Sequence, residues 1–475
     1  MLVKTLNFLY FSAILKQVNG KKSNKIIILI IFTPMDFRAK KILLLIGDII
    51  ILYFSLFLTM LIREKFDNGI SLQDHAMPFS TIFVVWIVVF YILDLYNFHL
   101  LKNKSIFFNS AFKAILISTL LSSVFFYINP TIGISPKTNL AIFTFISFFI
   151  FISWRNIVIN LLGSYLPKNN IGIIGYDNQV KEIAKTIQEN PHLGYHISFI
   201  VHNEEIDKIN ISELIKKNKI STIAIVSNTH YTENLRHGLF SSLSLGIDIV
   251  NFANFYEKIT GKIPLDSINQ MWFLENLSEG SKKWLNFSKR SYDLGLAFFI
   301  LLVTAIFWPI IGLIIKLEST GPFFFTQKRV GKNNTVFKII KFRTMKTENN
   351  NYEMTQANDQ RITNFGKFLR KTRIDEIPQV LNIILGDMSF VGPRPERPEL
   401  AQELKQKIPF YNQRTLVKPG LTGSDQVSGE YHSPSLEDTI KKLQYDLYYI
   451  KNRSIYLDLS ILLKTIATVL SKKGI

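Results

Sequence analysis

The chain has 475 residues and a formal net charge of +19 at pH 7; 48% of its residues are hydrophobic, and it contains no cysteine. This length suggests about three folding units, and the lack of cysteine excludes disulfides and thiolate metal sites. Because the apolar residues gather in long stretches, an ordinary soluble enzyme is excluded and a membrane protein is expected.

Residues 1–40 precede the first long apolar stretch. The apolar segment 26–32 is too short to cross a bilayer, which takes roughly 17–25 helical residues, and no small-residue cleavage site follows it. Met35 opens a stretch that reads as a natural N-terminus. We therefore treat residues 1–40 as an N-terminal segment whose true start is either Met1 or Met35.

Residues 41–165 contain four segments long and apolar enough to cross a bilayer, at 42–62, 78–96, 110–128 and 140–161. Arg155 is expected to extend its side chain to the membrane interface. Lysine and arginine gather before the first segment, between the second and third, and after the fourth. Because basic residues stay on the cytoplasmic side, this predicts a four-helix transmembrane bundle with both ends in the cytoplasm. A basic protein in a membrane attracts anionic lipid or phosphate ligands, so nucleic acid is not expected as a partner.

From residue 166 to 280, strand-like and helix-like segments alternate. Strands are expected at IGIIGY, YHISFIV, STIAIVS and GIDIVNF, with helices through Ile187 and near residues 213–217. This predicts a small parallel sheet of Rossmann type. A dinucleotide site needs G-x-G-x-x-G, whereas Gly175 is followed by Tyr176, Asp177 and Asn178. A structural or regulatory role is therefore favoured over tight dinucleotide binding.

Residues 281–475 open with a fifth apolar run, 292–317, which Pro309 interrupts. A complete span would place the basic C-terminal region outside the cell, against the positive-inside tendency. Because proline kinks helices, we expect a re-entrant membrane helix at residues 290–317 bent at Pro309; an ordinary fifth span is the alternative. A β-hairpin is expected at PFFFTQKRV and TVFKIIKFRTM, then a mobile polar loop at 347–359. A last helix, 454–475, is expected either on the membrane surface or packed on the domain.

Asp375 and Glu376 form an adjacent acid pair in a basic stretch. Proline suits a first helical turn and glycine the position after the last, so Pro378 and Gly386 bracket a helix with the acids at its start. Asp375 alone there would ordinarily be a capping residue. The helix dipole and nearby cations would also keep its carboxylate ionised and nucleophilic. Glu376 offers hard oxygen ligands for a divalent cation.

Cations in the neighbouring motifs suggest a phosphate site. Lys341 and Arg343 lie two residues apart, which places both on one side of a strand. Arg394 lies between prolines in Gly-Pro-Arg-Pro, and its planar fork suits phosphate oxygens. Lys418 opens the turn-rich Lys-Pro-Gly-Leu-Thr-Gly. Each alone fits a solvated charge or a rigid turn; together they predict a polyanion site with an acid nucleophile and a metal.

In this order, these motifs resemble the bacterial sugar transferases, the monotopic phosphoglycosyl transferases that start glycan assembly on polyprenyl phosphate. The shared stretches are KRSYD, QKRVG, KIIKFRTM, RITNFGKFLRKTRIDEIPQ to LNIILGDMSFVGPRPE, and VKPGLTG, over residues 285–475. The four apolar segments and the Rossmann-like region are similar to the large members, whose N-terminal part is accessory. Trp308, Ser424 and Asp425 depart from the family pattern, with expected effects on lipid fit or sugar choice.

The resemblance implies that Asp375 attacks the sugar-proximal phosphate of a UDP-sugar, releasing UMP, and that undecaprenyl phosphate then attacks the aspartyl-phosphosugar. It implies a Mg²⁺ site at Glu376 and Asp375, and phosphate contacts from Lys341, Arg343, Arg394, Arg329 and Lys418. The implied location is the bacterial inner membrane, with both α/β domains cytoplasmic, at the first membrane step of exopolysaccharide, capsule or O-antigen synthesis. The sugar stays unspecified, and a homo-oligomer is compatible with the sequence.

Two other functions stay open. A membrane-tethered NAD-dependent sugar-nucleotide enzyme would use the 166–280 domain, although this lacks the glycine fingerprint and a tyrosine followed by lysine at +4. A non-enzymatic polysaccharide-assembly scaffold would account for the apolar segments and the charge, but not for the acid pair. Release of UMP separates the transferase from both.

Overall fold

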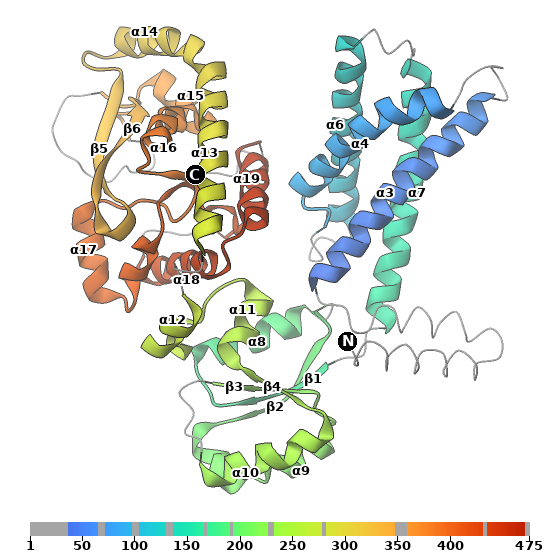
Figure 1. The fold of residues 1–475 in the computed structure, drawn as a ribbon, viewed down its shortest axis with the longest axis vertical. Coiled ribbons are helices and arrows are strands. Elements are labelled where there is room, and N and C mark those ends of the chain that lie inside the picture. The colour runs from blue at the N-terminus through green and yellow to red at the C-terminus, as the bar shows by residue number, and fades with distance from the viewer. Residues whose placement is uncertain are drawn as a thin grey trace. The chain divides into compact units, whose positions relative to one another are not determined.

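The computed structural model describes residues 37–64, 72–96, 104–129, 136–165, 169–190, 193–226, 232–277, 282–346, 359–430 and 435–470 (Figure 1). Most of the expected N-terminal segment 1–40 and of the polar loop 347–359 lies outside these residues. The chain divides into two compact units. One consists mainly of the helices before residue 171, and the other holds most of the α/β region and the whole C-terminal part.

Four long helices make up most of the first unit: α3 (Phe37–Glu64), α4 (Leu72–Ile92), α6 (Lys104–Ile128) and α7 (Pro136–Tyr165). Each contains a stretch long and apolar enough to cross a membrane, and Phe79, Trp86 and Phe143 are buried between them. α4 ends before the expected residue 96, because Asp94 adopts a left-handed backbone (φ 57°) and the chain turns. Several apolar helices thus identify a membrane protein.

Arg155 does not extend to an interface, so that prediction was wrong. Its side chain is fully buried on α7, and its Nη2 donates to Asp48 Oδ2 on α3 at 2.6 Å. The guanidinium also lies over the rings of Tyr96 and Phe151, with Cζ 5.3 and 4.9 Å from their centroids. An unpaired charge in an apolar interior is costly, so the partner determines where this arginine lies.

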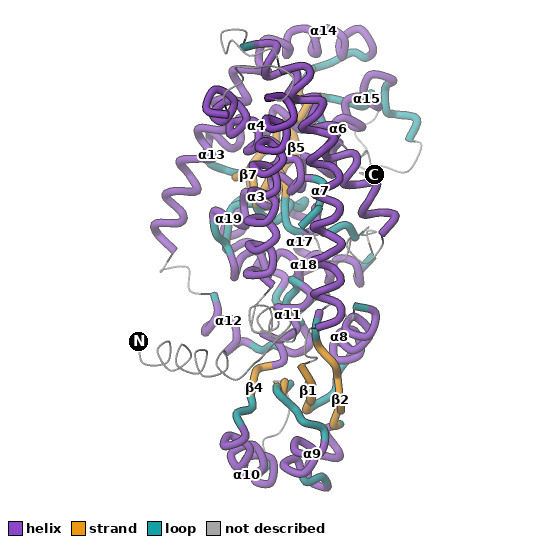
Figure 2. The backbone as a smooth tube through the Cα atoms, turned by 90° about the vertical axis from the view of Figure 1, so that its right-hand side faces the viewer, coloured by secondary structure: helices purple, strands orange, loops and turns teal. Residues whose placement is uncertain are grey.

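The α/β region contains β1 (Asn169–Ile174), β2 (Tyr195–Val201), β3 (Thr222–Ile225) and β4 (Asp248–Asn251) in the sheet order β2-β1-β3-β4. β3 and β4 pair in parallel. The helices that alternate with the strands are α8 (Asn178–Glu189), α9 (Ile211–Lys217), α10 (Glu233–Ser242) and α11 (Phe252–Thr260) (Figure 2). The expected alternation is confirmed, although α10 and α11 were not foreseen; the Rossmann-type assignment stays a prediction.

The fifth apolar run forms two helices, α13 (Lys283–Thr304) and α14 (Trp308–Glu318), joined by the 3-10 turn η7 (Ala305–Phe307). α14 lies across the end of α13 (Figure 1). Pro309 is in the first turn of α14, where its missing N–H leaves no bond unmade, so the chain bends in the turn just before it. Trp308 packs edge-on against Phe324 and Phe342 and thus faces the domain.

The C-terminal part is built on two short sheets. β5 (Phe324–Val330) and β6 (Val336–Phe342) form the expected antiparallel hairpin, and β7 (Ser389–Val391) pairs in parallel with β8 (Gly420–Thr422). Around them lie α15 (Asn364–Thr372), α16 (Val380–Leu385), α17 (Pro398–Lys407), α18 (Leu436–Asn452) and α19 (Ile455–Leu470). α19 packs on this domain through Ile461 and Asp458, while Leu459 and Ile466 are exposed.

Short 3-10 helices complete the described chain: η3 (Asn203–Lys208), η4 (Leu243–Leu245), η5 (Leu265–Ser267), η8 (Lys332–Asn334), η9 (Ile374–Gln379), η10 (Tyr411–Leu416) and η11 (Asp425–Val427).

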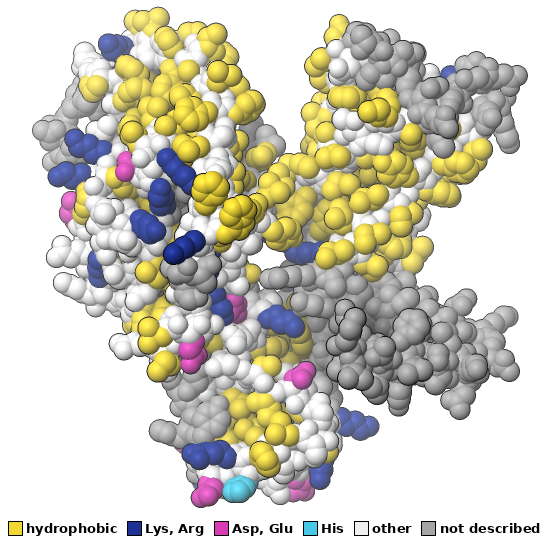
Figure 3. Space-filling model, in the orientation of Figure 1, with side chains coloured by type: hydrophobic (Ala, Val, Ile, Leu, Met, Phe, Trp, Pro, Cys, Tyr) yellow, Lys and Arg dark blue, Asp and Glu magenta, His cyan; other side chains and the backbone are white. Residues whose placement is uncertain are grey.

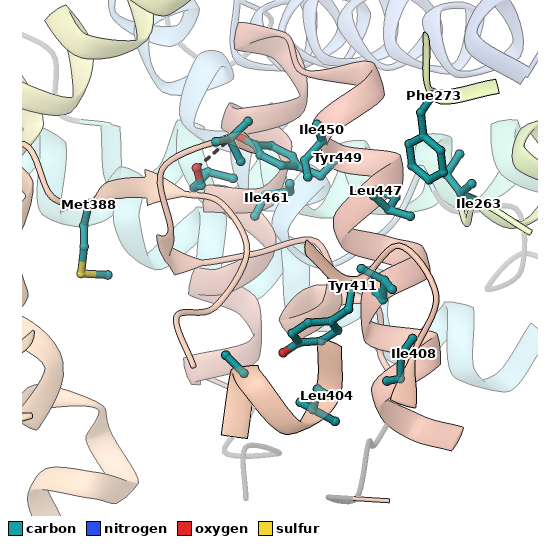
Figure 4. Packing of buried hydrophobic residues seen from close by; sticks show 14 of the residues in the cluster. Ile263, Phe273, Met388, Leu404, Ile408, Tyr411, Leu447, Tyr449, Ile450 and Ile461 are labelled. Atoms are coloured by element: carbon teal, nitrogen blue, oxygen red, sulfur yellow. Dashed lines mark hydrogen bonds between the residues drawn. The ribbon is translucent and has the colours of Figure 1, made fainter. Parts of the chain in front are cut away.

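The hydrophobic core of the C-terminal part extends past the expected boundary near residue 280. Phe273, on α12 (Gln270–Asn276), and Ile263 belong to the same buried cluster as Leu447 and Ile450 of α18 (Figure 4). The backbone N–H of Ile263 donates to the Gln444 carbonyl at 3.2 Å. The segment from α11 to α12 is therefore packed as part of the C-terminal domain.

Candidate functional site

The acid pair lies in the first turn of η9. α15 ends at Arg373, whose left-handed backbone (φ 59°) turns the chain into η9. Both acids are buried, with 8% of Asp375 and 9% of Glu376 exposed. No side chain caps the start of η9, and Asp375 Oδ1 has no hydrogen-bond partner among the described residues. The capping role considered for Asp375 is therefore absent.

Glu376 lies between two cations. Its Oε1 accepts from Lys341 Nζ at 2.7 Å and from Arg394 Nη2 at 3.2 Å. Lys341 lies on β6, which is bound to α16 by the side chain of Asn382. This amide donates to the Lys338 carbonyl at 2.7 Å and accepts from Ile340 N–H at 3.0 Å. The structure thus brings together four predicted residues: Asp375, Glu376, Lys341 and Arg394.

The two acids have opposite electrostatic environments. Burial alone would raise the pKa of Glu376, but Arg394 and Lys341 outweigh it and hold that pKa at about 2. Burial, and then the charge of Glu376, raise the pKa of Asp375 against the opposing effect of Lys341, Arg370 and Arg373. The expectation that cations dominate at Asp375 is therefore not met. Burial also lowers the pKa of Lys341.

Three other predicted contacts lie away from the acid pair. Arg343 follows the end of β6, and its Nη2 and Nη1 donate to the carbonyls of Ser319 (2.6 Å) and Thr320 (2.9 Å). Lys418 Nζ lies near Gly386, at the end of α16 opposite to the acids. Arg329 Nη1 donates to the Pro395 carbonyl at 3.0 Å and so supports the loop that carries Arg394.

Glycines allow the two turn motifs to pack backbone against backbone. A Cβ on Gly420 would lie 2.2 Å from Gly392 N, and a Cβ on Gly392 would lie 2.4 Å from the Lys418 carbonyl oxygen. The N–H groups of Gly392 and Gly420 donate to Thr422 and Pro393 carbonyls at 2.9 and 3.0 Å. The backbone of the Arg394 loop therefore packs against the strand pair β7–β8 more closely than residues with a side chain at positions 392 and 420 would allow.

The charged residues of the KRSYD motif bind other elements of the C-terminal domain, which was not predicted from the sequence. Arg290 donates to the Ile383 and Ile384 carbonyls at the end of α16 (2.5 and 2.8 Å), and Asp293 accepts from Phe390 N–H at 3.2 Å. Lys289 donates to the buried Asp458 of α19 at 2.7 Å. Basic and acidic residues at helical spacing were a signal for such contacts, but their partners are about 90 to 170 residues away.

The acid pair also meets the minimum for a magnesium site. No group of three or more histidine, aspartate or glutamate side chains that could hold a metal occurs among the residues that the structure describes. Mg²⁺ is nevertheless often held by one or two carboxylates together with substrate phosphates and water. Asp375, whose Oδ1 has no hydrogen-bond partner among the described residues, and the ionised Glu376 beside it are the carboxylates that would hold such an ion.

Residues 284–472 match the family described as "Bacterial sugar transferase". These residues include nearly all of α13, the whole of α14, the acid pair, and the cations described for this site.

Curated relatives show the same similarity. An Aeromonas hydrophila protein named "UDP-N-acetylgalactosamine-undecaprenyl-phosphate N-acetylgalactosaminephosphotransferase" is 38% identical over 48% of this chain and 53% of its own length. An Escherichia coli protein named "UDP-glucose:undecaprenyl-phosphate glucose-1-phosphate transferase" is 41% identical over 38% of this chain and 39% of its own. The chain therefore spans about half or less of these relatives. A Rhizobium leguminosarum protein named "Exopolysaccharide production protein PSS" is 38% identical over 39% of this chain and 96% of its own length.

Proposed function

Because the chain belongs to the bacterial sugar transferase family, we propose that it transfers a sugar-1-phosphate from a UDP-sugar to undecaprenyl phosphate and releases UMP. The observation that carries this proposal is the acid pair itself. Asp375 is buried with one oxygen that no described residue contacts by a hydrogen bond, and the adjacent Glu376 binds Lys341 and Arg394. Such a site provides both a nucleophile and positive charge for phosphate oxygens.

In the first step, an Asp375 carboxylate oxygen attacks the sugar-proximal phosphorus of the UDP-sugar. A bond from phosphorus to this oxygen forms, the bond to the bridging oxygen breaks, and UMP leaves. In the second step, an oxygen of undecaprenyl phosphate attacks the same phosphorus and frees the carboxylate. Lys341 and Arg394 offset the charge on the phosphate oxygens. Mg²⁺ bound by Glu376 and Asp375 would supply further neutralisation of the diphosphate.

The bent helix pair supports a re-entrant membrane segment. The surface around α14, at the bend, is largely apolar (Figure 3). The large apolar side chains exposed there are Leu302, Ile306, Phe307, Ile310 and Leu313. The start of α13 is held in the C-terminal domain by Lys289 and Asp458, and the end of α14 by Arg343 and Ser319. Since both ends contact one domain, a helix that crosses to the other side of the bilayer is disfavoured.

The proposal also assigns a location to the other helices and to the α/β regions. Helices α3, α4, α6 and α7 form the four-helix transmembrane bundle of an inner-membrane protein, and both α/β regions lie in the cytoplasm, in line with the distribution of basic residues. The Rossmann-like region is accessory. The Asp177 carboxylate accepts from Val180 N–H at the start of α8 (2.7 Å) and from Ser267 Oγ (2.5 Å), so a negative charge fills the position where a pyrophosphate would bind. This disfavours the NAD-dependent alternative.

The test measures UMP release by the purified protein in detergent, with a panel of UDP-sugars, Mg²⁺ and undecaprenyl phosphate. We expect Asp375→Asn to lower the rate at least 10³-fold, since the nucleophile is lost. The matched control, Glu403→Gln, removes an exposed acid on α17 and should retain the rate. Labelled UMP should exchange into the UDP-sugar without lipid acceptor in the wild type and not in Asp375→Asn. Full activity of Asp375→Asn would place the nucleophile elsewhere, and a lack of UMP with every sugar would favour a scaffold.

A further inference from the structure

The loop that carries Arg394 is bound through its backbone by a second arginine. Arg414, on η10, donates from Nη2 to the backbone carbonyl of Arg394 at 2.9 Å. The two side chains of this pair have different partners: Arg394 contacts Glu376, whereas Arg414 contacts the backbone carbonyl of Arg394 and the side chains of Tyr411 and Asp446.

Arg414 is itself fixed by buried partners. Its Nη2 lies 2.9 Å from Asp446 Oδ2 on α18, and only 10% and 4% of the two side chains are exposed. Its Nη1 donates to Tyr411 Oη at 2.5 Å, and its Cζ lies 5.1 Å from the centroid of that ring. A guanidinium spreads its donors over separate nitrogens in a rigid, planar fork, whereas an ammonium carries all of its donors on one nitrogen at the end of a flexible chain. A lysine therefore cannot hold the carbonyl, the hydroxyl and the carboxylate in the same geometry.

This arrangement bears on the distance between Arg394 and Glu376. The other cation on Glu376, Lys341, comes from a paired strand, whereas Arg394 comes from a loop. Pro393 and Pro395 restrict the backbone dihedral angles of that loop. The position of the loop relative to Glu376 is determined by its contacts with the rest of the domain. A displacement of about 1 Å at a catalytic group can lower a rate by about 10²-fold.

We propose that Arg414, held by Asp446, is a positioning residue that sets the place of the Arg394 guanidinium against Glu376; its catalytic consequence rests on the proposed transferase activity. The competing explanation is that the Arg414–Asp446 pair only holds η10 to α18. The two differ in one respect: a positioning residue loses its effect on rate once Arg394 is gone, whereas a purely structural pair does not.

The experiment is a double-mutant cycle on UMP release with Arg414→Lys and Arg394→Ala. We expect Arg414→Lys to lower kcat at least 10-fold in the wild-type background and less than 2-fold in Arg394→Ala. The control is Lys451→Met, which breaks another ion pair of α18, with Glu257 (2.6 Å), and should have the same effect in both backgrounds. Equal effects of Arg414→Lys in the two backgrounds would overturn the positioning role.

A second measurement does not depend on activity. In Arg414→Lys, amide hydrogen exchange of residues 392–397 should rise at least 10-fold, and in Lys451→Met it should not change. Unchanged exchange in Arg414→Lys would overturn the proposal even if the rate falls. A wild-type protein that releases no UMP would overturn the proposed function and the catalytic consequence with it, whereas an active wild type with additive variants overturns the positioning role alone.

Discussion

At the scale of single residues, the acid pair places two neighbouring carboxylates in opposite electrostatic environments. Lys341 and Arg394 hold Glu376 ionised, with a pKa at about 2, so it acts as a fixed negative charge and not as a proton donor. The pKa of Asp375 is raised by burial, which makes its ionised form more basic. Pairs of titratable groups whose pKa values are pushed apart in this way commonly have separate roles in catalysis.

Glu376 should stabilise the fold in a pH-dependent manner. Its folded pKa lies below the ordinary value of 4.5, so its contribution is present above about pH 4.5 and is lost as the pH falls towards 2. We expect the wild type to unfold at a higher temperature than Glu376→Gln at pH 7, without added Mg²⁺, and this difference to shrink below pH 4.5. Thermal unfolding in detergent measures it, with Glu403→Gln as the control. A difference that persists unchanged down to pH 3 would contradict this account.

At the scale of whole elements, a buried ion pair determines how two membrane helices meet. Asp48 on α3 and Arg155 on α7 are 107 residues apart and both fully buried. Gly47 lies beside them at a close contact with the Trp154 ring, where a Cβ would be 2.3 Å from Trp154 Cζ2. Since transfer of either charge alone into an apolar interior is costly, the pair specifies which faces of the two helices pack together.

Removal of one partner should therefore cost more than removal of both. We expect Arg155→Met alone to destabilise the bundle by about 3–5 kcal/mol, because it leaves Asp48 buried without its counter-ion. The double variant Asp48→Leu/Arg155→Met should recover most of this loss, since well-packed apolar residues can replace a buried pair. Thermal unfolding in detergent or lipid nanodiscs compares the three proteins. If the double variant is as unstable as the single one, the pair is not the source of the stability.

Local patterns made the elements predictable, and contacts distant in sequence did not. Hydropathy located the apolar helices, and alternation located the β5–β6 hairpin, because both signals lie within about twenty residues. Lys341 and Arg343 share the spacing of one strand face, but β6 ends at Phe342 and Arg343 turns to Ser319. Arg155 likewise looked like an interface residue, because its partner Asp48 lies on another helix. The acid pair could be predicted as a site because several basic motifs accompany it in the sequence.

At the scale of the molecule, the sequence boundary near residue 280 is not a boundary of packing. Buried residues of the 252–273 segment and of α18 form one hydrophobic cluster. Ion pairs also join this segment to the C-terminal part: Lys451 of α18 binds Glu257 at 2.6 Å, and Glu430, before α18, binds Lys262 at 2.9 Å. The end of the 166–280 region is thus a structural part of the C-terminal domain.

Two neighbouring residues of α12 provide a direct test of this shared core. Trp272 is 7% exposed and lies under the Lys451 ammonium, which is 5.1 Å from a ring centroid, whereas Met271 is 57% exposed. Loss of a buried tryptophan side chain costs about 3–5 kcal/mol, so Trp272→Ala should lower the unfolding temperature of the catalytic domain, and Met271→Ala should leave it nearly unchanged. The readout is loss of UMP release after heating, because it reports the catalytic domain and not the accessory one. If Trp272→Ala unfolds only the accessory region and the heated protein keeps its activity, the two regions are independent and the common core contributes nothing to the stability of the site.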